Sequence, residues 1–276
     1  MEKRSLNISK IEWDKFLIDL QKRIRDEKFQ LSLDKMMKID DKYYDENITP
    51  NELIKIIDEY REKDVQDVEN MENIQILLSG NPEIVFRLGI EAVRNNVKMI
   101  LNIEDFCLAQ NTILVDTINS IAEENNLYTR LILQNLVKDE KIYEISQRVD
   151  CTICFGNSND YNRLNRKYKI KDLRLYPYNI LELYMDSFDL EEVRIGVYEY
   201  TIRNQFQMEI YDMDLEIDDV INDMNNNGYG FCSILFSKDK EKIRKFKDNV
   251  KSKYVCVNEN PFKKIKWEFD LMKNHK

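Results

Sequence analysis

The sequence predicts an α/β protein in which an open, mostly parallel sheet carries helices on both faces. Three observations lead to this prediction. From Asn73 onward, short apolar runs alternate with helical stretches that are long enough to connect parallel strands. The runs are almost continuously apolar, as expected of strands covered on both faces. A chain of 276 residues with 43% hydrophobic residues can also bury a core of the necessary size.

Two amphipathic helices are expected ahead of this sheet. Ser9 and Glu12 form the sequence pattern of a capping box, and apolar residues at helical spacing follow them. Thr49 and Glu52 repeat the pattern. Pro50 then stands at the first helical position, where its missing N–H loses no hydrogen bond. We therefore predict helices that begin just after Ser9 and just after Thr49.

The alternating region provides five strands and four connecting helices. The predicted strands span residues 74–79, 97–103, 129–136, 151–155 and 173–178. The predicted helices span residues 83–95, 110–125, 138–148 and 159–166. Right-handed crossovers bring the carboxyl ends of all the parallel strands to one edge, where ligands bind in open α/β sheets. We therefore predict a ligand site lined by residues 79–82, 102–105, 134–135 and 156–158.

The last third of the chain is predicted to alternate in the same way. Its expected elements are a helix at 191–206, a helix at 217–226, a strand at 230–237, a helix at 239–250 and a strand at 253–258. Residues 264–273 alternate well enough for a final strand, although a short helix also fits. The lysines between residues 238 and 253 are interleaved with acids, which indicates a solvated helix face.

Composition excludes several classes of function. The net charge of −9 argues against a nucleic-acid-binding protein, because phosphate contacts need clustered Lys and Arg. No apolar run reaches about 18 residues, so a membrane-spanning helix is not expected. The first residues, MEKRSLNISK, lack the apolar core of a signal peptide, and we expect a cytoplasmic protein.

The cysteines are predicted to be structural. All five lie in or beside apolar runs and are expected to be buried and reduced: Cys107, Cys151, Cys154, Cys232 and Cys256. Cys151 and Cys154 are three residues apart in a strand, so their side chains point to opposite faces. The single histidine, His275, stands in the terminal tail. We therefore expect neither a metal site nor a thiol activated by histidine.

The segment from Asp218 to Phe262, DDVINDMNNNGYGFCSILFSKDKEKIRKFKDNVKSKYVCVNENPF, resembles the C-terminal part of the aldehyde dehydrogenase superfamily. In both, a helix leads through a Tyr-Gly turn and a strand to a Lys-rich helix and a strand ending in Val-x-Val-Asn. The resemblance extends over nearly the whole chain. It implies N-terminal helices at 1–70, a Rossmann-like domain at 71–185, and a reduced second α/β domain at 186–276 that is a remnant of the catalytic domain.

The resemblance also implies that the reaction-carrying residues are replaced. The general-base Glu of active members corresponds to Arg174, which stays protonated and cannot accept a proton. Their nucleophilic Cys corresponds to Glu209, the last residue of the segment 204–209 that matches the family's nucleophile motif. Glu209 fits a second family motif, Glu-Ile-Phe-Gly-Pro, equally well. Asn81 corresponds to the oxyanion-hole Asn, or is simply the N-cap of a helix. We predict no catalytic residue.

The cofactor implied by the resemblance is NAD or NADP, if any is retained. The Lys and Glu that hold the adenosine ribose in active members correspond to Asn102 and Asp105. Asn supplies no cation, whereas Asp can still accept ribose hydroxyls. The small residues beside the pyrophosphate correspond to Gly156 and Ser158. A simple turn with Ser158 capping the next helix is the alternative.

Three functional hypotheses follow. The first is a catalytically inactive aldehyde dehydrogenase-like protein that serves as a binding or interaction module in the cytoplasm. The second is an active NAD(P)-dependent aldehyde or acyl oxidoreductase with a strongly diverged site. The third is a non-catalytic subunit of an oxidoreductase complex, or a homo-oligomer, in which a strand at 264–273 extends the sheet of a neighbour.

Overall fold

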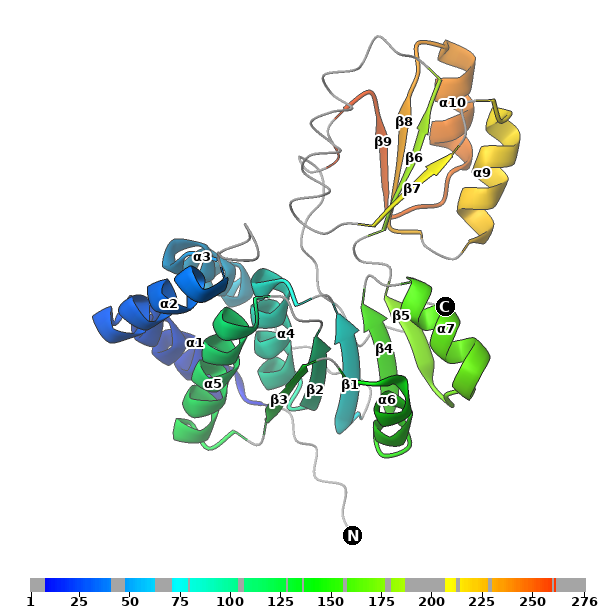
Figure 1. The fold of residues 1–276 in the computed structure, drawn as a ribbon. Coiled ribbons are helices and arrows are strands. Elements are labelled where there is room, and N and C mark those ends of the chain that lie inside the picture. Colours follow the sequence, from blue (N-terminus) through cyan, green and yellow to red (C-terminus); the bar gives the residue numbers. More distant parts are fainter. Residues whose placement is uncertain are drawn as a thin grey trace. The chain divides into compact units, whose positions relative to one another are not determined.

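The computed structural model describes two compact units, each built on one open sheet (Figure 1). The described residues are 8–40, 48–62, 71–78, 80–103, 107–127, 129–135, 137–155, 158–176, 180–186, 207–211, 214–227, 230–259 and 261. The first unit contains the N-terminal helices and a five-stranded sheet, and the second contains a four-stranded sheet. The predicted α/β class is therefore confirmed.

The N-terminal helices are α1 (Lys10–Arg25), α2 (Glu27–Asp40) and α3 (Pro50–Arg61). Both predicted capping boxes are present, since the side chain of Ser9 accepts from the Glu12 N–H and that of Thr49 from the Glu52 N–H. The apolar faces of α1 and α3 meet around the fully buried Trp13. The pattern analysis did not predict α2 as a separate helix.

The five-stranded sheet has the order β3-β2-β1-β4-β5 (Figure 1). Its strands are β1 (Asn73–Leu78), β2 (Lys98–Ile103), β3 (Leu131–Asn135), β4 (Cys151–Phe155) and β5 (Leu173–Tyr176). Its helices are α4 (Pro82–Arg94), α5 (Leu108–Glu124), α6 (Asp139–Ser146) and α7 (Ser158–Tyr168). The pairings β1–β2, β1–β4 and β2–β3 are parallel. All nine elements lie where the alternating pattern predicted them.

Close packing on one face of this sheet depends on Gly89 of α4. A Cβ atom at this position would overlap Cδ1 of Ile118 in α5 and would lie 3.1 Å from Cδ1 of Leu131 in β3. Leu131 therefore points toward α4 and α5. Side chains alternate along a strand. Residues an odd number of positions from Leu131 in β3, or from its register partner Met99 in β2, therefore point to the opposite face of the sheet.

The second unit contains a parallel sheet with the order β7-β6-β8-β9. Its elements are β6 (Ile180–Met185), β7 (Gln207–Tyr211), α9 (Ile217–Asn226), β8 (Cys232–Phe236), α10 (Lys240–Asn249) and β9 (Tyr254–Val257). Apolar residues of α9 and α10 pack with Tyr184 and Leu235 on one face of the sheet. The pattern analysis missed β6 and β7. The strand β6 pairs within this sheet, although the predicted division placed it in the segment 71–185.

The lysine-rich helix α10 has the solvated face that its sequence predicted. Lys242 pairs with Asp186 at 3.0 Å, and Lys245 pairs with Asp218 at 2.8 Å. The predicted helix at 191–206 and the predicted strand at 264–273 lie outside the described residues. Within the described part of the chain, no helix is long and apolar enough to cross a membrane, and no group of acidic, cysteine or histidine side chains could hold a metal ion.

Candidate functional site at the carboxyl edge of the five-stranded sheet

The strand register brings the predicted site segments to one edge of the sheet. Leu77 of β1 pairs with Asn102 of β2 and with Cys154 of β4, and Asn102 pairs in turn with Gln134 of β3. All four positions lie at or one residue before the carboxyl ends of their strands. Register partners in parallel strands point to the same face, so these side chains share the face opposite Leu131.

The turn after β1 leads directly into α4. Gly80 adopts φ 97°, a conformation that favours glycine, and its carbonyl accepts a hydrogen bond from Nδ2 of the buried Asn111. Oδ1 of Asn81 accepts from the N–H groups of Glu83 and Ile84 at 2.9 and 3.3 Å. Asn81 is thus the N-cap of α4, as the simpler of its two interpretations predicted.

Asn102 is the described member of the predicted ribose-binding pair. Its side chain is 5% exposed, and neither Nδ2 nor Oδ1 has a hydrogen-bond partner. Buried amides in folded proteins are nearly always paired, so this one requires an explanation. The position is neutral, because a carboxamide stands where the resemblance places a lysine.

Of the other three predicted cofactor residues, only Ser158 belongs to the part of the chain that the structure describes. Asp105 and Gly156 lie outside the described residues. Ser158 is the first residue of α7, so the chain does turn from β4 into a helix at the predicted place. The assignment of Asp105, Gly156 and Ser158 to a cofactor therefore stays a prediction.

Two further polar residues lie on the same face: Gln134, within the predicted site segment 134–135, and Gln75, which was not predicted as a site residue. Oε1 of Gln134 is buried without a partner. Gln75, fully buried two residues before Leu77, accepts a hydrogen bond from the hydroxyl of Thr152 at 3.1 Å, while its Nε2 is unpaired. A glutamine inside an otherwise apolar strand was the signal in the sequence that could have identified Gln75.

The positions that the resemblance assigns to the catalytic base and nucleophile carry ionic side chains. Nε and Nη2 of Arg174 in β5 donate to the two carboxylate oxygens of Asp172 at 2.9 and 2.8 Å. Glu209 is exposed and lies inside β7 rather than at a helix end. A guanidinium held by a carboxylate cannot remove a proton from water.

All five cysteines of the sequence are buried, as predicted, and each is at most 2% exposed. Cys151 and Cys154 occupy alternate faces of β4, and the thiol of Cys151 contacts Sδ of Met71 at 3.6 Å. Burial keeps these thiols from solvent-borne substrates.

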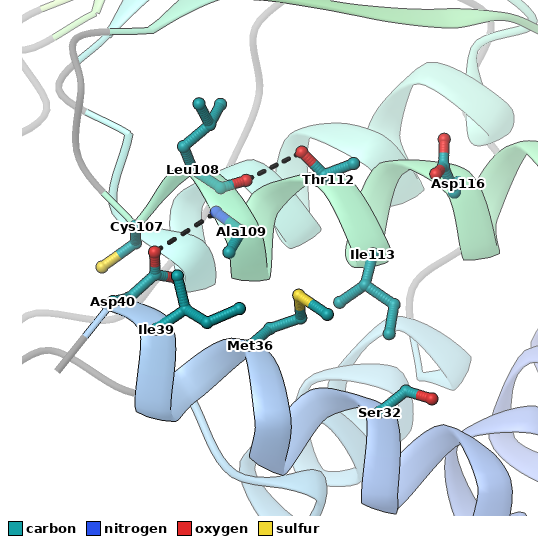
Figure 2. A pocket seen from close by; sticks show the side chains of 10 residues that line it. All are labelled: Ser32, Met36, Ile39, Asp40, Cys107, Leu108, Ala109, Thr112, Ile113 and Asp116. Carbon is teal, nitrogen blue, oxygen red and sulfur yellow. Dashed lines mark hydrogen bonds between the residues drawn. The ribbon is translucent and has the colours of Figure 1, made fainter.

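A groove of about 760 Å³ lies between α2 and α5, and Figure 2 shows the ten residues that line it. Two of its polar residues serve the fold. The buried carboxylate of Asp40 accepts from the N–H groups of Ala109 and Gln110 at 3.3 and 2.9 Å and so caps α5. The Thr112 hydroxyl donates to the Leu108 carbonyl at 2.8 Å. This groove is therefore a poorer candidate for a polar ligand than the sheet edge.

The second unit contains a buried carboxylate with several donors. Glu182 of β6 is fully buried and accepts hydrogen bonds from Nδ2 of Asn227, from the Tyr211 hydroxyl at 3.2 Å and from the Ser233 hydroxyl at 3.0 Å. The hydroxyls of Ser233 and Ser252 are 2.6 Å apart. Burial raises the pKa of Glu182 more than these donors lower it. The cluster joins β6, β7, β8 and the segments that flank α9 and β9.

We expect the Glu182→Gln variant to be more stable than the wild type at pH 7 and equally stable near pH 4. The pKa of Glu182 in the folded protein is raised, so its stabilising contribution is complete below the unfolded pKa and is lost as the pH rises through the folded pKa. Each unit of that rise corresponds to about 1.4 kcal/mol. Thermal unfolding of both proteins from pH 4 to pH 8 measures the difference. A constant difference across this range would contradict the prediction.

The two parallel sheets, with their helices and their connection order, are similar to the fold of solved aldehyde dehydrogenases. The chain is similar to γ-glutamyl phosphate reductase from Thermotoga maritima, with a TM-score of 0.58 and 12% identity over 93% of this chain and 85% of that one. It is similar to a propionaldehyde dehydrogenase from Clostridium phytofermentans, with a TM-score of 0.57 and 9% identity over 96% and 87% of the two chains.

An acetylating aldehyde dehydrogenase from Geobacillus thermoglucosidasius matches with a TM-score of 0.58 and 8% identity over 92% and 82% of the two chains. No protein-family model matches, and no curated protein matches. At these identities the likeness concerns the fold, which confirms the predicted resemblance at that level.

Proposed function

We propose that this protein is a catalytically inactive relative of the aldehyde dehydrogenases that acts as a binding module in the cytoplasm. The observation that carries the proposal is the burial of all five cysteines, each at most 2% exposed. Aldehyde oxidation by this fold needs a thiolate that reaches the substrate carbonyl. A thiol enclosed in the core offers no such nucleophile.

The environment of Arg174 supports the same proposal. The resemblance aligns Arg174 with the general base of active members. The carboxylate of Asp172 neutralises the Arg174 guanidinium. Arginine keeps its proton at any ordinary pH, so it cannot activate a hydrolytic water. Both chemical steps of the reaction, nucleophilic attack and proton removal, therefore lack a suitable group at the corresponding positions.

Binding at the sheet edge is compatible with the loss of catalysis. The relatives named propionaldehyde dehydrogenase and acetylating aldehyde dehydrogenase are dehydrogenases, and a bound dinucleotide would supply such enzymes with a hydride acceptor. The unpaired amide of Asn102 fits a hydroxyl or amide group of a ligand. It offers no cation to the additional phosphate of NADP, so we propose NAD ahead of NADP as a ligand.

An NAD(P)-linked assay over a panel of aldehydes and acyl thioesters tests the proposal. We expect no turnover above the rate without protein, for the physical reason that no thiol reaches the substrate. The alternative, an active oxidoreductase with a diverged site, predicts turnover that one cysteine substitution abolishes. Cys107→Ser and Cys154→Ser are the informative variants, because these two thiols lie nearest to the carboxyl edge in sequence. Turnover lost in either variant would overturn the proposal.

A further inference from the structure

The groove between α2 and α5 combines an apolar lining with charge of a single sign. Its apolar lining residues are Met36, Ile39, Cys107, Leu108, Ala109 and Ile113. Met36 of α2 and Ile113 of α5 point toward each other across the groove (Figure 2). The two charged lining residues, Asp40 and Asp116, are both acidic, and no lining residue is basic. A ligand that matches this surface has an apolar body and a positive charge.

The two carboxylates lie toward opposite ends of the groove and differ in their contacts (Figure 2). Asp40 is 6% exposed and caps α5. Asp116 is exposed, and within the described part of the chain no hydrogen bond or ion pair joins it to another residue. Ser32 of α2 lies at the same end of the groove as Asp116. A carboxylate and a hydroxyl on facing helices can both accept hydrogen bonds from one ammonium group, which has three donors.

The size of the groove suits a small molecule. Its volume of about 760 Å³ lies within the range of roughly 300–1,000 Å³ that is typical of small-molecule sites. From Leu108 to Asp116, α5 rises about 12 Å along the groove. A stable protein interface takes roughly 20–30 residues from each partner, more than the ten that line this groove. Ile39 is 52% exposed, so a ligand that covers it removes apolar surface from water.

We propose that this groove binds a small amphiphilic amine, a molecule with an apolar body and a primary ammonium group. The apolar body lies against Ile39 and Ile113, and the ammonium group pairs with Asp116. The groove shares no lining residue with the site predicted at the carboxyl edge of the five-stranded sheet. The inference therefore goes beyond the proposed function and does not depend on it.

Titration calorimetry with three ligands of equal chain length tests the required charge. Octylammonium, octanol and octanoate are compared below their micellar concentrations. We expect octylammonium to bind about tenfold or more tightly than octanoate, and this preference to shrink as salt is added, because salt screens an exposed carboxylate. Equal affinities for the three ligands, or no binding of octylammonium at millimolar concentration, would overturn the proposal.

Two matched pairs of variants locate the bound amine. Asp116→Asn should lower the affinity for octylammonium about tenfold and leave that for octanol unchanged. Asp34→Asn removes an exposed carboxylate of α2 outside the groove and controls for net charge. Ile39→Ser should weaken the binding of both ligands. Leu31→Ser should weaken neither, because Leu31 is 53% exposed on the same helix but does not line the groove.

All four positions are exposed, so the variants should keep the fold, which far-UV circular dichroism verifies. Equal effects of the two aspartate variants would refute the role of Asp116. Equal effects of Ile39→Ser and Leu31→Ser would show that the alkyl chain does not lie in the groove, and would refute the site.

Discussion

The Trp13→Ala variant is expected to lose about 3–5 kcal/mol of unfolding free energy. Trp13 is fully buried, stacks on Phe16 with a centroid separation of 5.9 Å, and meets the edge of Tyr60 at 6.5 Å. Alanine would leave a cavity between α1 and α3 that the rigid helices cannot close. Urea denaturation followed by far-UV circular dichroism measures the loss.

Two variants of the same helix serve as controls for Trp13. Ile11 is 82% exposed, so Ile11→Ala should change the unfolding free energy by less than about 0.5 kcal/mol. Nε1 of Trp13 has no hydrogen-bond partner, so Trp13→Phe loses volume but no hydrogen bond and should cost much less than alanine. Equal losses for Ile11→Ala and Trp13→Ala would contradict the assigned packing of α1.

The Arg87→Ala variant is expected to lose about 3 kcal/mol, the lower end of the range for breaking a buried ion pair. The Arg87 side chain is 2% exposed and pairs with Glu59 at 2.8 Å and with Glu83 at 2.9 Å. Burial opposes its charge, but the two carboxylates outweigh burial and hold the pKa of Arg87 above its usual value. Without the guanidinium, two half-buried carboxylates remain facing each other, partly hydrated.

A second arginine provides the matched control for Arg87. Arg61 of α3 pairs with Asp58 at 3.1 Å, but both side chains are more than one-third exposed. Arg61→Ala should therefore change the unfolding free energy by no more than about 1 kcal/mol. Arg87→Met retains the buried stem and separates lost packing from lost charge. An Arg87→Ala loss no larger than that of Arg61→Ala would refute the buried-pair assignment.

The fold of the first unit was predictable because its signals are local. Helix starts are marked by the capping boxes at Ser9 and Thr49, and buried strands by the apolar runs from Asn73 onward. Each of these signals spans only a few residues. Right-handed crossovers then convert that order into a parallel sheet with a defined ligand edge. In the second unit, β6 and β7 escaped prediction because Glu182 and Glu209 interrupt their apolar patterns.

The sequence predicted the position of Asn102 at the sheet edge, but it did not predict that the amide of Asn102 would lack a hydrogen-bond partner. The segment containing Asn102 was expected at the carboxyl edge, and the strand register places it there. The unpaired state of its amide was not predictable, because it depends on Gln134, a residue 32 positions away whose side chain is brought alongside only by the pairing of β2 and β3. Hydrogen-bond satisfaction is a property of spatial neighbours rather than of sequence neighbours.

The sequence by itself determined the α/β class, the order of helices and strands in the first unit, the caps of α1 and α3, and the burial of five cysteines. Periodicity and capping act between residues a few positions apart, so each can be recognised in the linear chain. Only the tertiary structure decided that Glu182 is enclosed by donors from β7, β8 and Asn227, which follows α9, and that the Asn102 amide has no hydrogen-bond partner. Both outcomes arise from contacts between segments that are distant in sequence, where desolvation and hydrogen-bond geometry are set by the packed sheet.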